Sequence, residues 1–211
     1  MKIAIVTDKS RESLIPSEEA LMEDEQKNLT VTAIQEVLSK KYDSISLIAD
    51  DNIITTLKRE KVDLVFNLSN GIDGDSKLAQ LPALLEFAGI PYTASSILGH
   101  SIAINKIFSS TVFKHSKIPT PRFWSISSLE DLQELELTYP LIVKPSDEGS
   151  SRGIHQDSLV FDEESLYAKM KESLETYNPP IMLNQYVEGR EFSIGLIGNG
   201  ENITVLPIQE V

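Results

Sequence analysis

A lysine followed by a short loop rich in glycine and serine is the feature of this sequence that most directly indicates chemistry. The apolar run Leu141–Val143 predicts a buried strand, Lys144 ends it, and residues 145–153 read PSDEGSSRG. Side chains do not screen the backbone N–H groups of such a loop, so these groups can bind an anion together, and a nearby ammonium adds positive charge. The pattern predicts a phosphate-binding loop. The alternative is a hairpin loop with a solvated lysine, because glycine and serine are common in turns.

The composition indicates a globular protein that is not a general binder of polyanions. The chain has 211 residues, of which 41% are hydrophobic and 7% aromatic, enough for one large domain or two small ones. A net charge of −13 repels nucleic acid and anionic lipid. The absence of cysteine excludes disulfides and thiolate sites. With no long apolar run and no signal peptide, the sequence predicts a cytoplasmic protein that binds neither nucleic acid nor membrane.

The sequence before residue 95 predicts a parallel sheet with helices on both faces. These elements would position the loop relative to a substrate. Strands are expected at 2–6, 44–49 and 62–68, and helices at 27–40, 53–60 and 77–88. Strand and helix alternate, which is typical of a doubly wound α/β domain. The segment Thr7–Glu12 after the first strand is not a G-x-G-x-x-G turn, so the sequence argues against a nicotinamide or flavin site.

The elements after residue 95 predict an α+β arrangement with an antiparallel sheet. Helices are expected at 98–115, 129–135 and 162–176, the last with Asp162 as its N-cap. Strands are expected at 122–126, 141–144, 181–187, 191–196 and 202–208.

Five separated motifs resemble those of one family, in the same order and at similar spacing. They are Val65–Asn67 with Gly71 and Gly74, Gln80–Glu86 with Gly89–Thr93, Asn105–Lys106 with Ile118–Pro121, Val143–Pro145 with Glu148–Ile154, and Glu188–Phe192. Together they resemble the D-alanine–D-alanine ligases, and by this resemblance the chain is identified as a member of the ATP-grasp superfamily.

The resemblance implies an α/β fold in two parts. A doubly wound parallel-sheet (pre-ATP-grasp) domain is expected at 1–95, followed by an α+β ATP-grasp domain. Its central lobe is expected at 96–185 and the beginning of its C-terminal lobe at 186–211. The second lobe is expected to be incomplete in this chain. The family's magnesium ligands would then lie beyond residue 211, so we assign no metal ligand here and expect no catalysis by the chain alone.

The resemblance also implies an activity, the ATP-dependent joining of a carboxylate to an amine through an acylphosphate. ATP and amino acids, D-alanine among them, are the expected small-molecule partners, magnesium is the expected second cofactor, and a homodimer is expected by analogy. The implied site residues are Lys106 and Lys144 at the ATP phosphates, Gly149, Ser150, Ser151 and Gly153 in the loop over the γ-phosphate, Gln185, Tyr186 and Val187 at adenine, and Glu191 at ribose. Glu12 is expected to bind the first substrate's amine, and Glu12 and Ser150 are the expected catalytic residues.

Departures from the family pattern leave several alternatives open. Thr7–Asp8 stands where the family has a glycine pair, and Asn70–Gly71 stands where it has His-Gly, so the amino-acid substrates are not fixed. Lys106 as a surface lysine and Glu191 as an ion-pair partner of Arg190 are the plainer readings of those residues. A non-catalytic nucleotide-binding or interaction protein, and an ATP-grasp ligase for another acid, are the alternative functions.

Overall fold

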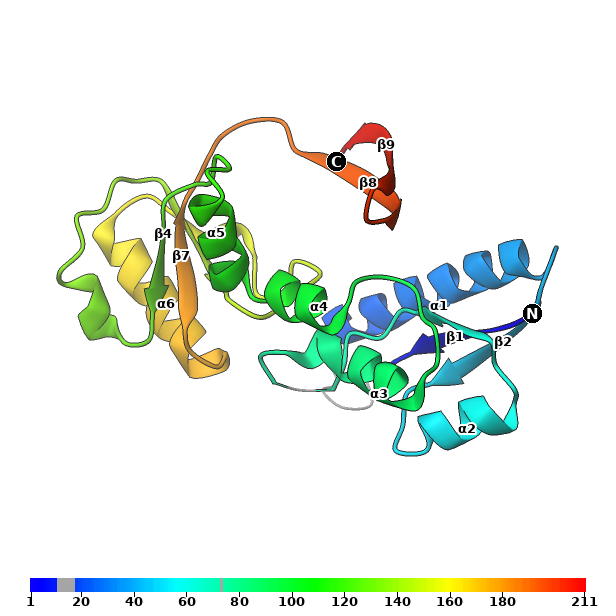
Figure 1. The fold of residues 1–211 in the computed structure, drawn as a ribbon. Coiled ribbons are helices and arrows are strands. Elements are labelled where there is room, and N and C mark those ends of the chain that lie inside the picture. The colour runs from blue at the N-terminus through cyan, green and yellow to red at the C-terminus, as the bar shows by residue number, and fades with distance from the viewer. Residues whose placement is uncertain (11–17, 73) are drawn as a thin grey trace. The chain divides into compact units, whose positions relative to one another are not determined.

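The chain forms two compact units, each built from two segments of the sequence. The computed structural model describes residues 1–10, 18–72 and 74–211 (Figure 1). The first unit contains residues 1–119 and 145–153, and the second contains 120–144 and 154–211. The segment that carries the glycine-serine loop therefore packs with the N-terminal residues, although the strand that leads into it belongs mostly to the second unit.

The first unit is built on a three-stranded parallel sheet in the order β2-β1-β3. Its strands are β1 (Lys2–Thr7), β2 (Asp43–Ile48) and β3 (Leu64–Asn67), and both neighbours of β1 run parallel to it. Residues 3–6 of β1 are fully buried, as expected for a continuous apolar run in the centre of a parallel sheet. The mixed α/β class predicted from the sequence is thereby confirmed, whereas the domain boundaries at 95 and 185 stay a prediction.

Helices lie on both sides of this sheet. In Figure 1, α1 (Glu18–Leu38) lies on one side, and α2 (Ile53–Arg59) and α3 (Gln80–Ala88) lie on the other. A 3-10 turn, η1 (Lys77–Ala79), leads into α3. The core of the unit consists of side chains from β1, β3, α2 and α3, namely Ala4, Val6, Ile53, Leu57, Val65, Leu81 and Leu85.

The single helix predicted at 98–115 is wrong, because the chain forms two helices there. They are α4 (Ile97–Ile104) and α5 (Lys106–His115), and Asn105 between them is extended, with φ −89° and ψ 105°. The Asn105 side chain accepts hydrogen bonds from the N–H groups of Ile107 and Phe108 and so caps α5. The apolar pattern continues through the break, which hides it from a periodicity argument. The cap fixes Lys106 as the first residue of α5.

Replacing Asn105 with alanine is expected to destabilise the first unit by about 1 kcal/mol, because two helix N–H groups lose their acceptor. Urea unfolding followed by circular dichroism measures the change. Asn105→Asp is the matched control, since its carboxylate also accepts at a helix N-terminus and should retain most of the stability. Equal losses in both variants would contradict a capping role.

The second unit is built on a four-stranded sheet in the order β4-β7-β5-β6. The strands are β4 (Phe123–Ile126), β5 (Leu141–Pro145), β6 (Leu159–Val160) and β7 (Ile181–Gln185). β4 and β7 are antiparallel, as are β5 and β6. The short turns η2 (Leu129–Leu132) and η3 (Gln156–Ser158) precede β5 and β6, and η2 is shorter than the helix predicted at 129–135.

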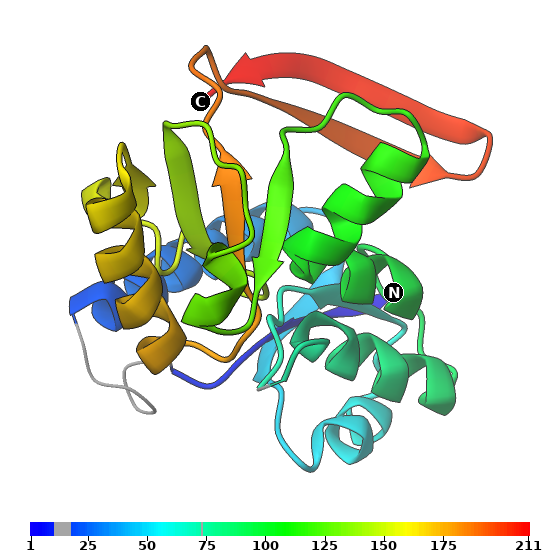
Figure 2. The ribbon, with the colours of Figure 1, turned by 90° about the vertical axis from the view of Figure 1, so that its left-hand side faces the viewer.

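One helix packs on this sheet and completes its core. Helix α6 (Glu163–Thr176) lies along one face, as Figure 2 shows. Asp162 caps it by accepting from the N–H of Ser165 at 2.8 Å, as the sequence predicts. Leu166 and Met170 of α6 are buried with Leu141 and Val143 of β5. Because strand side chains alternate between faces, Lys144 points to the face opposite Leu141 and Val143.

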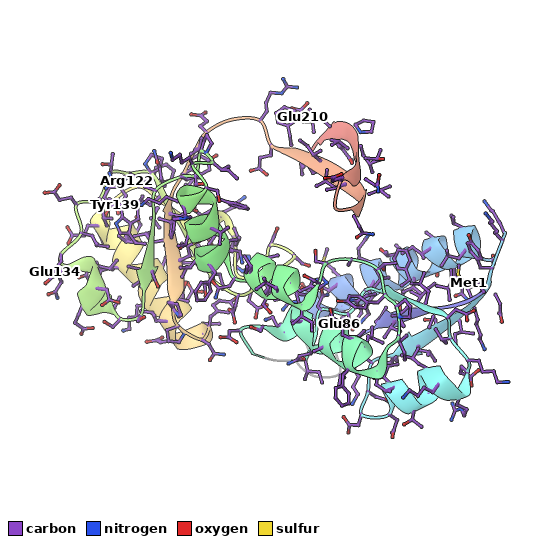
Figure 3. The ribbon with its side chains drawn as sticks, viewed as in Figure 1. Met1, Glu86, Arg122, Glu134, Tyr139 and Glu210 are labelled. Carbon is purple, nitrogen blue, oxygen red and sulfur yellow. The ribbon has the colours of Figure 1, made fainter. Side chains whose placement is uncertain are left out.

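The last two strands form an antiparallel hairpin of their own. They are β8 (Phe192–Asn199) and β9 (Asn202–Glu210), and all of their side chains are exposed. Arg190 forms two hydrogen bonds with Glu210, at 2.7 and 2.8 Å; Glu210 is labelled in Figure 3. Within the described part of the chain, no helix is long and apolar enough to cross a membrane.

Candidate nucleotide-binding site

The glycine-serine loop adopts a conformation that is unusual for residues with side chains. Ser150 and Ser151 both have left-handed backbones, with φ 53° and 59°, and Gly153 has φ 71°. Each left-handed serine costs about 1 kcal/mol or more, and such strain concentrates at ligand-binding loops. Within the residues that the structure describes, neither Ser150 N–H nor Ser151 N–H donates a hydrogen bond. The loop therefore presents two amides in succession, as an anion-binding site requires.

Lys106 braces the entrance of this loop. Its backbone N–H donates to Ser146 O at 2.7 Å, and its ammonium donates to Pro145 O at 3.1 Å and to Glu148 O. The surface-lysine reading of Lys106 is therefore wrong, because the side chain is partly buried and bonded to a segment about forty residues later in the chain. The ammonium that the sequence assigns to ATP phosphates thus lies directly beside the loop, in the same unit.

A network of four charged side chains surrounds the same loop. Glu148 accepts hydrogen bonds from Lys77 at 2.9 Å and from Arg152, and Arg152 also donates to both carboxylate oxygens of Glu23, at 3.0 and 3.3 Å. Sequence reasoning assigned no role to these residues. The only signal in the sequence is the spacing of Glu148 and Arg152, four residues apart on either side of the serines.

Lys144 lies in the second unit, at the end of β5, and its side chain is partly buried. Burial lowers the pKa of its ammonium, because removal from water disfavours the charged form. Among the described residues, no carboxylate or carbonyl forms a hydrogen bond or ion pair with this ammonium. A partly buried cation that lacks a protein partner fits the side chain of a ligand-binding lysine better than that of a solvated hairpin residue.

The carboxyl ends of β1 and β3 meet at a second polar cluster. The Asp8 carboxylate accepts from the Asn70 N–H at 2.6 Å and from the Ser69 hydroxyl. In a sheet of order β2-β1-β3 this edge is the topological switch point, where ligands of doubly wound sheets bind. Two of the departures from the ligase motifs, at positions 8 and 70, are thus in direct contact. Glu12, the expected amine ligand, lies outside the described residues.

The residues assigned to adenine begin with the last residue of β7, and two of their backbone N–H groups form hydrogen bonds inside the second unit. Gln185 N–H donates to Arg122 O at 2.8 Å, and Tyr186 N–H donates to Pro140 O at 3.2 Å; Arg122 is labelled in Figure 3. Tyr186 and Val187 are exposed. A purine bound here would contact other groups of the segment, such as the Val187 backbone, rather than these two amides.

Glu191, the residue assigned to ribose, is exposed just before β8, and its carbonyl accepts from Val211 N–H at 3.0 Å. The alternative pairing with Arg190 is not formed, since Arg190 bonds to Glu210. The carboxylate of Glu191 is therefore available for the role that the resemblance implies.

The described residues fit a nucleotide phosphate better than they fit a metal ion. Consecutive loop amides and the Lys106 ammonium are donors that an anion requires. Among residues 1–10, 18–72 and 74–211, no group of three or more histidine, aspartate or glutamate side chains is placed to hold a metal.

Comparisons with known proteins find similar sequences among ligases. The family described as "D-ala D-ala ligase C-terminus" matches residues 112–211. An uncharacterized protein of Sinorhizobium fredii is 35% identical over 188 residues, covering 85% of this chain and 54% of that protein. A D-alanine–D-alanine ligase of Geotalea uraniireducens is 35% identical over 165 residues, covering 77% of this chain and 51% of the ligase. The chain thus spans about half the length of the curated relatives that it matches.

The fold is also shared with solved structures. The D-alanine–D-alanine ligase of Bacillus anthracis complexed with ATP superposes with a TM-score of 0.72 at 22% identity, covering 100% of this chain and 65% of that one. At this identity the likeness shows the fold alone, and the curated relatives carry the family assignment. From the matched family and the relatives, we conclude that this chain is a D-alanine–D-alanine ligase-like protein of the ATP-grasp superfamily.

Proposed function

We propose that this chain supplies the nucleotide-binding part of an ATP-dependent ligase that joins a carboxylate to an amine and acts in the cytoplasm. The observation that carries the proposal is the loop at 149–153, with the Lys106 ammonium beside it and two left-handed serines whose amides donate no hydrogen bond to any described residue. This arrangement offers donors to a phosphate before any ligand arrives, so little reorganisation is needed on binding. The structure of a related ligase with bound ATP supports the same choice of ligand.

In the proposed reaction, a carboxylate oxygen of the first amino acid attacks the γ-phosphorus of ATP, and ADP leaves. The amine of the second amino acid then attacks the acyl carbon, the bond to the phosphate oxygen breaks, and phosphate and a proton are released. Phosphoryl transfer depends mostly on positioning and charge neutralisation. The roles proposed for this chain are of that kind: Lys106 and Lys144 neutralise phosphate charge, and the loop amides with Ser150 orient the γ-phosphate.

The two substrates that the proposed ligase joins are inferred from the names of relatives. Relatives are named as D-alanine–D-alanine ligases, and we propose amino acids, D-alanine among them, as substrates. Asp8 and Asn70 stand in contact where the family motifs have glycine and histidine, so we propose that the site for the first substrate differs from that of the named ligases. A homodimer remains part of the proposal, and light scattering tests it.

MgATP at ten times its dissociation constant is expected to stabilise the folded chain by about 1.4 kcal/mol, because only the folded state binds it. Thermal unfolding with and without millimolar MgATP measures this, and MgAMP, which lacks the β- and γ-phosphates, is the matched control. Equal shifts with both nucleotides would contradict phosphate recognition by the loop.

A second candidate, a non-catalytic nucleotide-binding or interaction protein, is favoured by one observation. The described residues hold no cluster of acidic side chains that fits a metal, which phosphoryl transfer from ATP generally uses. We therefore expect no phosphate release from this chain alone with ATP and mixed D-amino acids. Turnover in that assay would exclude the second candidate, whereas self-association without any ATP shift would favour it.

A further inference from the structure

The charge network around the loop joins three parts of the first unit that are far apart in sequence. Arg152 bonds to Glu23 of α1, and Glu148 bonds to Lys77 of η1, across separations of 129 and 71 residues. We propose that Glu23, Lys77, Glu148 and Arg152 form a latch that holds the loop in its strained conformation before nucleotide binds. In that role all four are positioning residues.

The burial of the network separates it from ordinary surface ion pairs. Its side chains are only 11–23% exposed. Exposed pairs contribute little, since water and salt screen them, whereas partly buried pairs with several hydrogen bonds are much less screened. Arg152 uses two nitrogens on Glu23 and a third on Glu148, so its planar guanidinium is fixed in direction as well as in place.

The partners of the loop are held by rigid backbone. Glu23 lies within the long helix α1, and Lys77 begins η1. Gly71 has φ 79°, and a Cβ at that position would lie 1.9 Å from Lys77 O, so the backbone of the preceding loop packs tightly against Lys77. The glycine-serine loop is therefore bonded to side chains whose backbones belong to other elements of the unit.

The positions of the two loop residues explain what the latch does. Glu148 and Arg152 flank the left-handed pair Ser150 and Ser151, so both ends of the strained turn are anchored. An unanchored loop would relax out of that conformation, because left-handed serines are unfavourable by about 1 kcal/mol or more each. The latch thus keeps the two serine amides in the conformation that the proposed phosphate site needs.

The charges of the latch argue against a direct role in binding phosphate. Two cations and two carboxylates bond to one another, so the network has no net charge to offer an anion. Its contribution is the shape of the loop. The inference rests on the proposed function only in calling the loop a nucleotide site; the latch itself can be tested without nucleotide.

Trypsin provides that test, because it cleaves after Arg152, next to the buried Gly153, and a buried bond must open locally before it is cut. Glu23→Gln and Lys77→Met each break the latch while leaving the cleavage site intact. Each is expected to raise the rate of cleavage after Arg152 roughly fivefold, relative to cleavage after the exposed Lys117 of the same unit. Mass spectrometry of the fragments gives both rates from one digest.

Cleavage after Lys117 distinguishes opening of the latch from general unfolding. Unfolding of the whole unit accelerates cleavage after both Arg152 and Lys117, so the ratio of the two rates stays unchanged. Glu60→Gln is the matched control: it breaks an ion pair with Lys2 in the same unit, 3.1 Å long, and should leave the ratio as in the wild type. Ratios in Glu23→Gln and Lys77→Met equal to that of Glu60→Gln would overturn the proposal.

A second measurement needs no variant. Raising NaCl from about 0.05 to about 1 M shortens the screening length from roughly 14 to 3 Å, and it should change the same ratio in the wild-type chain only slightly, because the ion pairs are partly buried. A rise as large as that expected for Glu23→Gln would show that salt screens these pairs as it screens exposed ones, and would also overturn the latch. Protection of Arg152 by MgATP in these digests reports on the proposed function separately, because the latch predicts the ratios without nucleotide whether or not ATP binds.

Discussion

Replacing Lys106 with methionine is expected to weaken MgATP binding about hundredfold. The variant removes an ammonium that the proposed site directs at phosphate, and a charge-assisted contact of this kind contributes about 1.5–3 kcal/mol. It also removes the hydrogen bonds that the ammonium donates to Pro145 O and Glu148 O, so the first unit should lose about 1–3 kcal/mol of stability. Isothermal titration with MgATP measures the first effect and urea unfolding the second.

Lys114→Met is the matched control, because Lys114 is an exposed lysine on the same helix. It should leave the affinity for MgATP unchanged and alter stability by no more than about 0.5 kcal/mol, the usual range for surface substitutions. Unaltered affinity in Lys106→Met, measured under conditions where the variant is folded, would remove Lys106 from the nucleotide site. An affinity loss of equal size in both variants would indicate a general charge effect.

The order of strands and helices was largely readable from the sequence, because hydrophobic periodicity reports local structure. The apolar run at 2–6 became the buried central strand, and Asp162 became a helix cap. The predicted helix boundaries were wrong where hydrophobic periodicity gives no signal. Helix α1 begins at Glu18, well before the predicted residue 27, since its early turns are charged and largely exposed. The break at Asn105 depends on the bond from Lys106 N–H to Ser146 O, which no local pattern encodes.

The sequence indicated only part of the candidate site. The resemblance assigned Lys106, Lys144 and the glycine-serine loop to the site, because motifs keep their order along the chain, and these assignments stay predictions. It gave no indication that Arg152 would bond to Glu23, a residue 129 positions earlier, or that Asp8 would contact Asn70. Such contacts depend on how distant segments pack. Residues outside the recognised motifs therefore entered the site only with the structure.

Replacing Lys144 with methionine is expected to change stability and binding in opposite directions. The partly buried ammonium has no partner among the described residues, so an apolar side chain of similar length should stabilise the second unit by about 1 kcal/mol. The same variant should weaken MgATP binding about hundredfold, because a phosphate-neutralising cation is lost. Thermal unfolding and titration with MgATP measure the two effects on one sample.

The pH dependence of unfolding distinguishes this explanation from a simple gain in packing. Because burial lowers the pKa of Lys144, the unfolded chain binds more protons than the folded chain between the lowered pKa and the ordinary lysine value of 10.5. The stability contributed by this group therefore rises with pH through that window, and the advantage of Lys144→Met should shrink toward alkaline pH. Lys171→Met, at an exposed lysine of α6, should show neither the gain in stability nor its pH dependence.

A Lys144→Met variant that is less stable than wild type at neutral pH would show that the ammonium is well solvated, as in the hairpin alternative. A variant that gains stability but loses affinity for MgATP is expected when a lysine serves ligand binding rather than folding. Burying an unpaired charge lowers stability, so its presence is explained by a function outside folding.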